Sequence, residues 1–263
     1  MNIRDKISFI KLMKIELKNP GILFDEEHHT YTRKRDGQLL PGVSTILNTK
    51  AADYLKFWTT KMNYEYMMKN WDLGKIYTQQ EKEDLLLKAK NAHAVRSKGA
   101  ANKGSLAHKW IEDYIKKKNP ILPTDVEVMN CVTAFLEWEQ QTKVVWLISE
   151  LLVASEKYSY CGTLDALGVI ENKLVLIDFK TSNQISEEYF LQTAGYQIAL
   201  EEMGAVPDSR LILRFPKNGK GFEALTIKSD LNFDKEVFLY LREVHKWNIF
   251  IESRREELGL KKY

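Results

Sequence analysis

Two apolar runs separated by a short polar segment dominate the hydrophobic pattern in the second half of the chain. The first run carries Asp165, the second ends in Asp178, Phe179 and Lys180, and the segment Glu171–Lys173 lies between them. Apolar runs of about four to eight residues, rich in Val, Ile and Leu and bounded by polar residues, are typical of buried strands. The pattern therefore predicts two neighbouring buried strands joined by a tight turn.

Strand periodicity places acidic side chains among apolar ones, because successive side chains point to opposite faces. The predicted faces are Leu174, Leu176, Asp178 and Lys180 against Val175, Ile177 and Phe179 on the second strand, and Thr163, Asp165 and Leu167 together on the first. A buried charge is costly unless it is paired or bound to a metal. Two converging carboxylates would repel each other, and a divalent cation relieves that repulsion. The alternative is that Asp178 and Lys180 form a solvated pair at a strand end and that Asp165 belongs to a turn.

A predicted helix follows these strands, and its apolar side is interrupted by one polar residue. The apolar positions are Ile185, Tyr189, Tyr196 and Met203, with Gln192 among them. A glutamine on the inner side of a helix needs a hydrogen-bonding partner in the interior. Gln192 is therefore a candidate for a role beyond packing.

The remaining pattern predicts a hairpin, several helices and three more strands. A hairpin over Phe24–Leu40 turns at Asp36-Gly37, residues 51–118 are mostly helical, Asp125–Lys143 is a helix, Val144–Tyr158 is a strand, and strands at Arg210–Phe215 and Gly221–Ile227 follow. Within the strand over Val144–Tyr158, the residues Glu150, Leu152, Ala154 and Glu156 share a face. Strands mixed with helices in this order predict an α/β fold with a central mixed sheet flanked by helices.

Both ends of the chain are predicted to be helical. Residues 1–18 form an amphipathic basic segment, and the acidic Asp5 and Glu16 within it argue against a mitochondrial transit peptide. The terminal helix starts at Asp230 or Asn232 and runs to about Leu258. Its expected buried stripe is Phe233, Val237, Leu241, Val244, Trp247 and Phe250.

Chain length and composition fit one globular domain. A chain of 263 residues and 30.7 kDa, with 44% hydrophobic and 29% charged residues, is long enough for a well-packed core. We predict a single domain over residues 1–263, divided into a hairpin and helical region at 24–143, a sheet core at 144–230 and a terminal helix at 231–263. No apolar run approaches the roughly eighteen residues needed to cross a bilayer, so no membrane partner is expected.

Local charge points to nucleic acid more strongly than net charge does. The formal net charge is only +3, but residues 88–118 contain nine Lys or Arg residues against Glu112 and Asp113. A basic segment of this kind can follow a phosphate backbone, although basic runs are more commonly a solvated face. Lys98, Lys103, Ser105 and Lys109 lie in this segment and are candidate DNA contacts.

A second candidate phosphate contact lies at a predicted helix start. Ser44 or Thr45, after Pro41-Gly42, can cap a short helix, and hydroxyls and amides at a helix start suit phosphate groups. A plain capped helix is the equal alternative.

The two cysteines, Cys131 and Cys161, are too few for a disulfide framework and suit a reducing compartment. We therefore expect a cytoplasmic protein, either bacterial or encoded by a virus and acting in the host cytoplasm.

The order of the motifs resembles the PD-(D/E)XK nuclease superfamily. Gly162-x-x-Asp165 is followed thirteen residues on by Asp178-x-Lys180 and then by Gln192-x-x-x-Tyr196. The last motif is similar to that of the RecB-like branch, which includes viral and mitochondrial exonucleases, and the resemblance covers roughly residues 24–204. The block from His29-x-Tyr31 to Leu47 also resembles the N-terminal signature of those exonucleases. The resemblance implies a restriction-endonuclease-like core, with the helical N-terminal region arching over the active site.

The resemblance also implies roles for individual residues. Asp165, Asp178, the carbonyl of Phe179 and the imidazole of His108, in the motif Gly104-x-x-x-His108, would hold one or two Mg²⁺ or Mn²⁺ ions. Lys180 would orient or help to deprotonate the attacking water, and Gln192 and Tyr196 would position the substrate strand or the lysine. Glu150 resembles a further acid of the family site, and Thr181 is a candidate DNA contact. The two cysteines exclude the four-cysteine iron–sulfur cluster of some RecB-like proteins.

Three functions follow from this pattern. The first is a metal-dependent DNA exonuclease acting on a free, preferably single-stranded end. The second is a structure-specific endonuclease or resolvase, and the third is a non-catalytic DNA-binding module on the same scaffold. The presence of Asp165, Asp178 and Lys180 together favours an enzyme, because an inactive copy would be expected to lack at least one of them.

Overall fold

The computed structural model describes residues 17–50, 53–228 and 232–260, with the side chains of residues 53–58 left undescribed. The helix expected over residues 1–18 lies outside the described residues except for its last two positions, and Asp230 also lies outside them. The chain forms two compact units, one of residues Met1–Lys50 with Ala107–Tyr263 and the other of Ala51–Leu106. The single-domain prediction stays a prediction.

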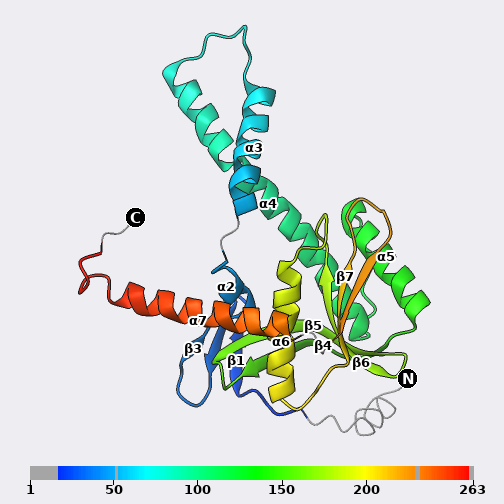
Figure 1. The fold of residues 1–263 in the computed structure, drawn as a ribbon. Coiled ribbons are helices and arrows are strands. Elements are labelled where there is room, and N and C mark those ends of the chain that lie inside the picture. The colour runs from blue at the N-terminus through cyan, green and yellow to red at the C-terminus, as the bar shows by residue number, and fades with distance from the viewer. Residues whose placement is uncertain (1–16, 51–52, 229–231, 261–263) are drawn as a thin grey trace. The chain divides into compact units, whose positions relative to one another are not determined.

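The larger unit is built on a mixed five-stranded sheet with the order β4-β5-β6-β7-β8 (Figure 1). The strands are β4 (Val145–Ser155), β5 (Tyr160–Ile170), β6 (Lys173–Lys180), β7 (Ser209–Arg214) and β8 (Glu223–Lys228). All neighbouring pairs are antiparallel except β6 and β7, which are parallel. The predicted α/β fold with a central mixed sheet flanked by helices is confirmed.

A two-residue turn joins β5 to β6 and sets their register. Glu171 and Asn172 both have positive φ angles, 50° and 63°, and Ile170 pairs directly with Lys173. Positive φ at both central residues is the geometry of the type I′ turn, whose twist matches that of the flanking strands. The predicted pair of buried strands with a tight turn is therefore confirmed.

Helices cover both faces of the sheet, and β6 contributes to both cores. The helices are α2 (Val43–Leu47), α4 (Gln79–Ile115), α5 (Val126–Thr142), α6 (Glu188–Glu202) and α7 (Phe233–Ser253). Val175, Ile177 and Phe179 pack with α5 and the last turns of α4. Leu174 and Leu176 pack with α2, α6 and α7 on the opposite face. The alternation predicted for this strand is present.

The helix α6 connects the parallel strands β6 and β7, as parallel neighbours require. Arg210 on β7 is fully buried and ties this connection to α7: its guanidinium donates to the Phe190 carbonyl at 2.8 Å and contacts Asp234 at 2.7 Å. Asp178 and Lys180 lie at the carboxyl end of β6. In open α/β sheets, ligand sites lie outside the carboxyl ends of parallel strands.

The N-terminal hairpin prediction is wrong in one respect, because the segment forms three strands. These are β1 (Ile22–Asp25), β2 (Thr30–Arg33) and β3 (Leu39–Leu40), and the predicted Asp36-Gly37 turn joins β2 to β3. The capping prediction for α2 is also wrong. Gly42 is the N-cap, the helix starts at Val43, and no side chain caps it.

The strand predicted over Val144–Tyr158 is shorter than expected. It ends at Ser155, so Glu156 lies beyond β4 in a turn, where it is exposed. The helix predicted over Asp125–Lys143 is confirmed: Asp125 caps α5 by accepting from the backbone amides of Glu127 and Val128, and Lys143 ends it in the left-handed conformation.

The terminal helix departs from its predicted packing. Asn232 precedes α7, as one of the two predicted starts, but the residues that α7 buries fully or nearly so are Phe238 and Arg242. Val237 and Leu241 of the predicted stripe are partly buried, whereas Trp247 is 58% exposed and Phe250 is 52% exposed. The predicted helix is present, but the side of it that faces the core differs from the predicted stripe.

The smaller unit is a pair of helices, α3 (Asp53–Asn70) and the first part of α4. The loop between them is braced by Trp71 and Tyr77, whose rings stack 5.0 Å apart. Arg96 turns toward α3, where it contacts the sulfur of Met62 and lies 3.9 Å from Glu65. The basic segment therefore does not form one uninterrupted cationic row. Among the described residues no helix is both long and apolar enough to cross a membrane.

A glycine substitution tests the packing of α6 against α7. A Cβ atom at Gly195 would lie 2.7 Å from the Phe238 ring, whereas one at Gly99 in α4 would meet nothing within 4 Å. We expect Gly195→Ala to lower the free energy of unfolding in urea by about 1–3 kcal/mol, because it overpacks a filled interface. Gly99→Ala is the control, and helix propensity predicts no loss and up to about 1 kcal/mol of gain. Equal effects of the two substitutions would contradict the described interface.

Candidate active site

The two central acids meet where β5 and β6 part. The ladder between these strands runs from the turn to Ala166 and Ile177, and the next opposed pair in this register is Asp165 and Asp178. The ladder stops there, and the Asp165 carboxylate instead accepts the Phe179 N–H at 2.6 Å. Directly opposed residues of an antiparallel pair project to the same face. Asp165 and Asp178 are therefore brought together.

Lys180 supplies the positive charge of this group. Its Nζ lies 2.6 Å from Oδ2 of Asp178 and 4.7 Å from the centre of the Tyr189 ring on α6. At this distance the Lys180 ammonium is the charge partner of Oδ2 of Asp178, a buried oxygen that no other group among the described residues reaches with a hydrogen bond. A cation held between a carboxylate and an aromatic face has little freedom to turn.

Burial and mutual repulsion shift the titration of these groups. Burial raises the pKa of Asp178 to about 6, which Lys180 opposes and the Asp165 charge reinforces. Burial also raises the pKa of Asp165, against the opposing effects of Lys180 and the Phe179 amide. For Lys180, burial lowers the pKa, but the two carboxylates outweigh it and the net direction is upward. When both aspartates are ionised, the group therefore holds two negative charges against the single positive charge of Lys180.

His108 reaches the same site from α4, as the sequence predicted. Its Nδ1 lies 3.8 Å from Oδ1 of Asp165, and its ring meets the Phe179 ring edge-on at a centroid distance of 6.3 Å. Burial and the nearby Lys180 lower the pKa of His108 to about 4, so the imidazole is neutral near pH 7. A neutral imidazole is the form that can donate a lone pair to a metal.

Glu150 is the third acid of the site, and its backbone is unusual. It has φ of 54° within β4 and is missing from the ladder, although its neighbours Ser149 and Leu151 pair with β5. The side chain keeps access to solvent, yet crowding by protein atoms and the charges of Asp165 and Glu112 raise its pKa to about 7. Non-glycine residues held at positive φ inside strands are costly and cluster at functional sites.

The predicted alternation of β5 fails at the same place. Thr163, Asp165 and Leu167 were expected on one face, but Leu164 and Leu167 belong to the same core cluster, while Thr163 meets Tyr31 of β2. Strict alternation would separate Leu164 from Leu167, so it is interrupted between them, opposite Glu150. A local break of this kind re-aims a side chain and cannot be read from a hydrophobic pattern.

Gln192 and Tyr196 act as a unit one helical turn apart. The Gln192 amide donates to the Tyr196 hydroxyl at 3.0 Å, which supplies the interior partner that the sequence required. Burial and then the charges of Asp178 and Asp165 raise the pKa of Tyr196, consistent with a phenol close to both acids. Gly162 is needed because a Cβ there would lie 2.6 Å from the Tyr196 ring.

Sequence reasoning missed the support behind Lys180. The Lys217 ammonium, from the loop after β7, donates to the Thr181 carbonyl at 2.7 Å and to its hydroxyl at 3.2 Å. The Phe215 amide donates to the Lys180 carbonyl at 2.7 Å. Lys217 also contributes to the lowered pKa of His108. No sequence motif predicts these contacts, because they join segments that are far apart in sequence.

The other candidate DNA contacts are not part of this cluster. Ser44 and Thr45 are exposed on α2. Lys109 is ion-paired on its own helix, at 2.9 Å from Glu112 and 3.5 Å from Asp113. Lys98, Lys103 and Ser105 belong to the smaller unit.

The donor atoms suit a hard divalent cation, although they are not gathered as a complete set. Carboxylate oxygens of Asp165 and Asp178 and a neutral imidazole are ligands that Mg²⁺ and Mn²⁺ accept, and Oδ2 of Asp178 is a buried acceptor whose partner among the described residues is the Lys180 ammonium. Within the described ranges, no three His, Cys, Asp or Glu side chains form a group that could hold a metal ion. A cation bound by both aspartates would compete with the Lys180 ammonium for Asp178.

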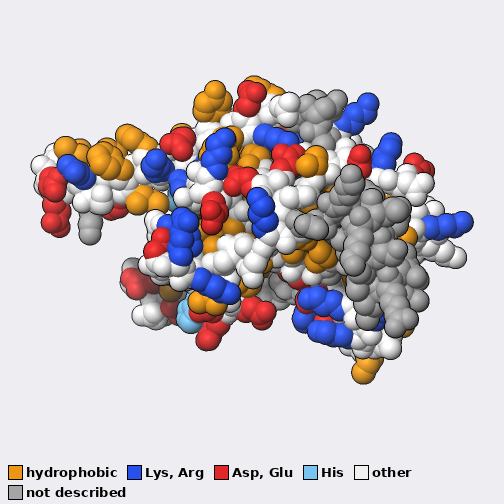
Figure 2. Space-filling model, turned by 90° about the horizontal axis from the view of Figure 1, so that it is seen from below, with side chains coloured by type: hydrophobic (Ala, Val, Ile, Leu, Met, Phe, Trp, Pro, Cys, Tyr) orange, Lys and Arg blue, Asp and Glu red, His pale blue; other side chains and the backbone are white. Residues whose placement is uncertain are grey.

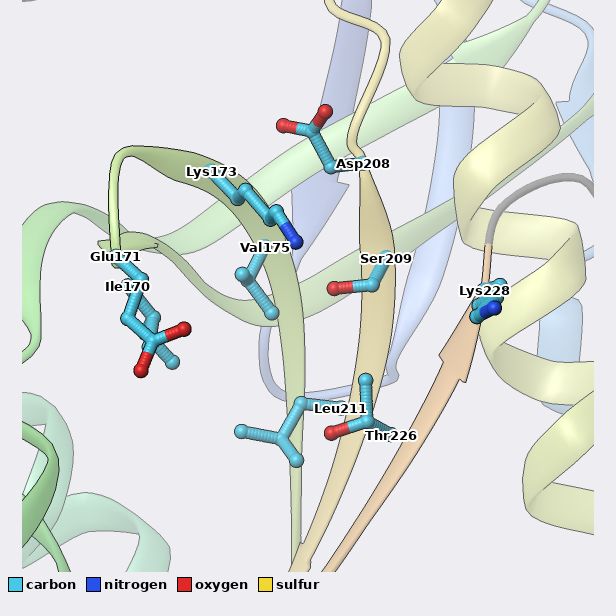
Figure 3. Close-up of a pocket in the computed structure, with 9 residues that line it drawn as sticks. All are labelled: Ile170, Glu171, Lys173, Val175, Asp208, Ser209, Leu211, Thr226 and Lys228. Atoms are coloured by element: carbon cyan, nitrogen blue, oxygen red, sulfur yellow. The ribbon is translucent and has the colours of Figure 1, made fainter.

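Two surface hollows lie away from this cluster. One, of about 460 Å³, is at the other end of β6 beside the β5–β6 turn, where its lining residues surround the starts of β6 and β7 (Figure 3). The other, of about 510 Å³, lies at the end of α4 beside Trp146. Neither of these two hollows is lined by Asp165, Asp178 or Lys180.

Comparisons with known proteins give only distant likenesses. No protein-family model matches the chain, and no curated protein sequence matches it. Similar solved structures include the alkaline exonuclease LHK-Exo of Laribacter hongkongensis, with 10% identity, coverage of 83% of this chain and 92% of that one, and a TM-score of 0.39. A protein of Eubacterium rectale provisionally described as an exonuclease has 12% identity, coverage of 81% and 88%, and a TM-score of 0.39. At these sequence identities and TM-scores the likeness says nothing about the chemistry of this chain. That chemistry has to be inferred from the residues of the site.

The contact between Gly162 and Tyr196 is testable by a double-mutant cycle. We expect Gly162→Ala to lower the free energy of unfolding by about 1–3 kcal/mol, because the new methyl group overlaps the phenol ring. In a Tyr196→Leu background the same substitution should cost clearly less, since the ring is absent. Urea unfolding of the four proteins measures this difference. Additive effects would show that Gly162 and Tyr196 are not in contact.

Proposed function

We propose that this protein is a metal-dependent deoxyribonuclease that hydrolyses phosphodiester bonds. The observation that carries the proposal is the meeting of Asp165, Asp178 and Lys180 where β5 and β6 separate, with a neutral His108 beside them. Such a cluster holds excess negative charge beside a fixed ammonium. Hydrolysis of an anionic phosphodiester needs charge neutralisation and an oriented water, and a carboxylate pair with a lysine can serve both needs.

In the proposed site, Asp165 and Asp178 would hold one or two Mg²⁺ or Mn²⁺ ions, with His108 and the Phe179 carbonyl as further ligands. A bound divalent cation supplies Lewis acidity toward a phosphoryl oxygen and an attacking water. If both aspartates served as metal ligands, Lys180 would no longer be paired with Asp178. The Tyr189 ring, 4.7 Å from Nζ, then keeps the ammonium at the site.

Lys180 and the residues around it would have the remaining catalytic and substrate-binding roles. The ammonium would orient the water and offset charge that develops on the phosphate in the transition state. The paired Gln192 and Tyr196 would hold the substrate strand or the lysine. Glu150, whose pKa of about 7 suits proton exchange at neutral pH, would act as a nearby acid.

DNA with a free, preferably single-stranded end is the proposed substrate, and replication, recombination or repair is the proposed context. The proposed phosphate contacts are Ser44, Thr45, Lys98, Lys103, Ser105, Lys109 and Thr181. The resemblance of Gln192-x-x-x-Tyr196 to the RecB-like motif favours an exonuclease over an endonuclease or resolvase. A non-catalytic DNA-binding role is the second candidate, and it is favoured by nothing beyond the basic segment.

Substitution of the central charges tests catalysis directly. End-labelled single- and double-stranded DNA should be degraded by the wild-type protein with Mg²⁺ or Mn²⁺ and left intact with EDTA. We expect Asp178→Asn and Lys180→Ala each to lower the rate by about a hundredfold to a thousandfold or more, because each removes a group that stabilises the transition state. Filter binding should show little change in DNA affinity. Cleavage at the wild-type rate by either variant would rule out the mechanism.

Metal binding can be tested without activity. A ligand that binds only the folded protein raises its melting temperature. We expect Mn²⁺ to raise the melting temperature of the wild-type protein, to have little effect on Asp178→Asn, and to have a reduced effect on His108→Ala. His93→Ala is the matched control, since His93 is on α4 in the smaller unit and should respond as the wild type does. Equal responses of the two histidine variants would remove His108 from the ligand set.

A further inference from the structure

The hollow beside the β5–β6 turn gathers polar side chains that the fold itself does not use. Its volume of about 460 Å³ lies within the range of about 300–1,000 Å³ that is usual for small-molecule sites. Its floor is apolar, because Val175 and Leu211 belong to the core cluster packed against α5. Four polar side chains from three neighbouring strands line the hollow above this floor: Lys173, Ser209, Thr226 and Lys228.

Strand register brings these four side chains to one face of the sheet. Val175 pairs with Ser209, and Ser209 pairs with Lys228, so the three positions lie side by side across β6, β7 and β8. Lys173 comes two positions before Val175 on β6. Thr226 comes two positions before Lys228 on β8, and side chains two apart in a strand share a face. Figure 3 shows the Lys173 side chain extending from β6 toward β7 and the Ser209 hydroxyl pointing back toward β6.

None of the four side chains serves an internal contact. Among residues 17–50, 53–228 and 232–260, their two ammoniums and two hydroxyls have no hydrogen bond and no ion pair. Ser209 is only 8% exposed, yet its hydroxyl keeps access to the hollow. A polar group that is held near the interior without a partner is costly unless something else binds it. The four groups are therefore open to a ligand.

The two carboxylates beside the hollow do not neutralise its ammoniums through ion pairs. Asp208 accepts the Leu174 N–H at 2.7 Å, and its own N–H donates to the Leu174 carbonyl at 2.8 Å, so this aspartate joins the starts of β6 and β7. Glu171 lies in the β5–β6 turn, and Figure 3 shows its carboxylate on the far side of β6 from β7 and β8. The positive charge of the hollow is therefore left for a ligand.

The chemistry of these groups selects an anion with several oxygens. Ammoniums and hydroxyls donate hydrogen bonds, and a phosphate monoester has three strong acceptor oxygens and a charge of about −2 near pH 8. The formal net charge of the chain is only +3, and Figure 2 shows Lys and Arg side chains interspersed with Asp and Glu over the face drawn there. Attraction of an anion to this hollow must therefore come from its own two ammoniums.

We propose that this hollow binds a phosphate monoester, with Lys173 and Lys228 on the charged oxygens, Ser209 and Thr226 as hydrogen-bond donors, and the apolar floor beneath the rest of the ligand. The phosphate group is the chemistry that the site recognises, and inorganic phosphate and a nucleoside 5′-monophosphate are two sources of it. The hollow lies at the other end of β6 from Asp178, on the opposite face of the sheet. Neither the proposal nor its test depends on nuclease activity.

Titrations of the full chain followed by backbone-amide NMR test the proposal. We expect inorganic phosphate and deoxyadenosine 5′-monophosphate each to cause saturable shifts at the amides of Lys173, Ser209 and Lys228 near pH 8. Sodium chloride at the same ionic strength should cause none. The nucleotide should bind more tightly than phosphate, because its sugar and base can cover the apolar floor. Equal affinities would overturn the role of the floor and leave inorganic phosphate as the source.

Lysine substitutions test the assignment of the charges. We expect Lys173→Ala and Lys228→Ala each to weaken nucleotide binding by about three- to tenfold, because each removes one of two ammoniums. Both residues are exposed, so neither substitution disturbs packing, and circular dichroism verifies the fold. Lys220→Ala is the matched control, since Lys220 is also exposed but does not line the hollow, and it should bind as the wild type does.

Three results would overturn the proposal. The first is the absence of saturable shifts at these amides with either phosphate compound. The second is an equal response to sodium chloride, which would show a general effect of ionic strength. The third is an affinity that neither lysine substitution changes, or that Lys220→Ala lowers as much as they do.

Discussion

The repulsion between two opposed carboxylates, one buried and one half-buried, is the constraint around which the larger unit is arranged. Asp165 and Asp178 are opposed across the end of a strand pair, where the Asp178 side chain is 2% exposed and that of Asp165 is 17% exposed, so little solvent reaches them to neutralise their charges. The fold supplies a counter-charge from Lys180 and a hydrogen-bond donor from the Phe179 amide. Burial outweighs these stabilising contacts and leaves the pKa values of both carboxyls raised.

Much of the surrounding structure serves to hold Lys180. The Tyr189 ring lies over its ammonium, and the Phe215 amide and the Lys217 ammonium bind the backbone at and after it. Two segments distant in sequence therefore converge on Lys180: α6 on its side chain and the loop after β7 on the backbone at and after it. Positioning of this kind is expected at sites where a misplacement of about 1 Å costs much of the catalytic rate.

The sequence predicted the parts of the site that depend on local rules. Strand periodicity, a turn between apolar runs and a glutamine inside a helix stripe each have a direct structural cause. The structure opposes Asp165 and Asp178 across β5 and β6 and gives Gln192 a partner in Tyr196. The sequence could not reveal that the alternation of β5 breaks opposite Glu150, because positive φ at a glutamate follows from its surroundings and not from its residue type. It also could not identify Lys217, whose contact with Thr181 depends on the path of the loop after β7. For α7, the sequence predicts the helical period, but the period alone does not decide which apolar side of the helix packs against the core.

The turn at Glu171 and Asn172 has a consequence for how the site could be lost. Strand register is fixed by the turn, and a slip of one residue would send every side chain of β6 to the other face. Asp178 would then enter the aromatic core beneath α5, while Phe179 would face the acids. The two-residue turn at the far end of β6 therefore decides which face of the sheet Asp178 occupies, although the turn does not contact the cluster. A one-residue insertion in this turn would separate Asp178 from Asp165, although neither residue would be substituted.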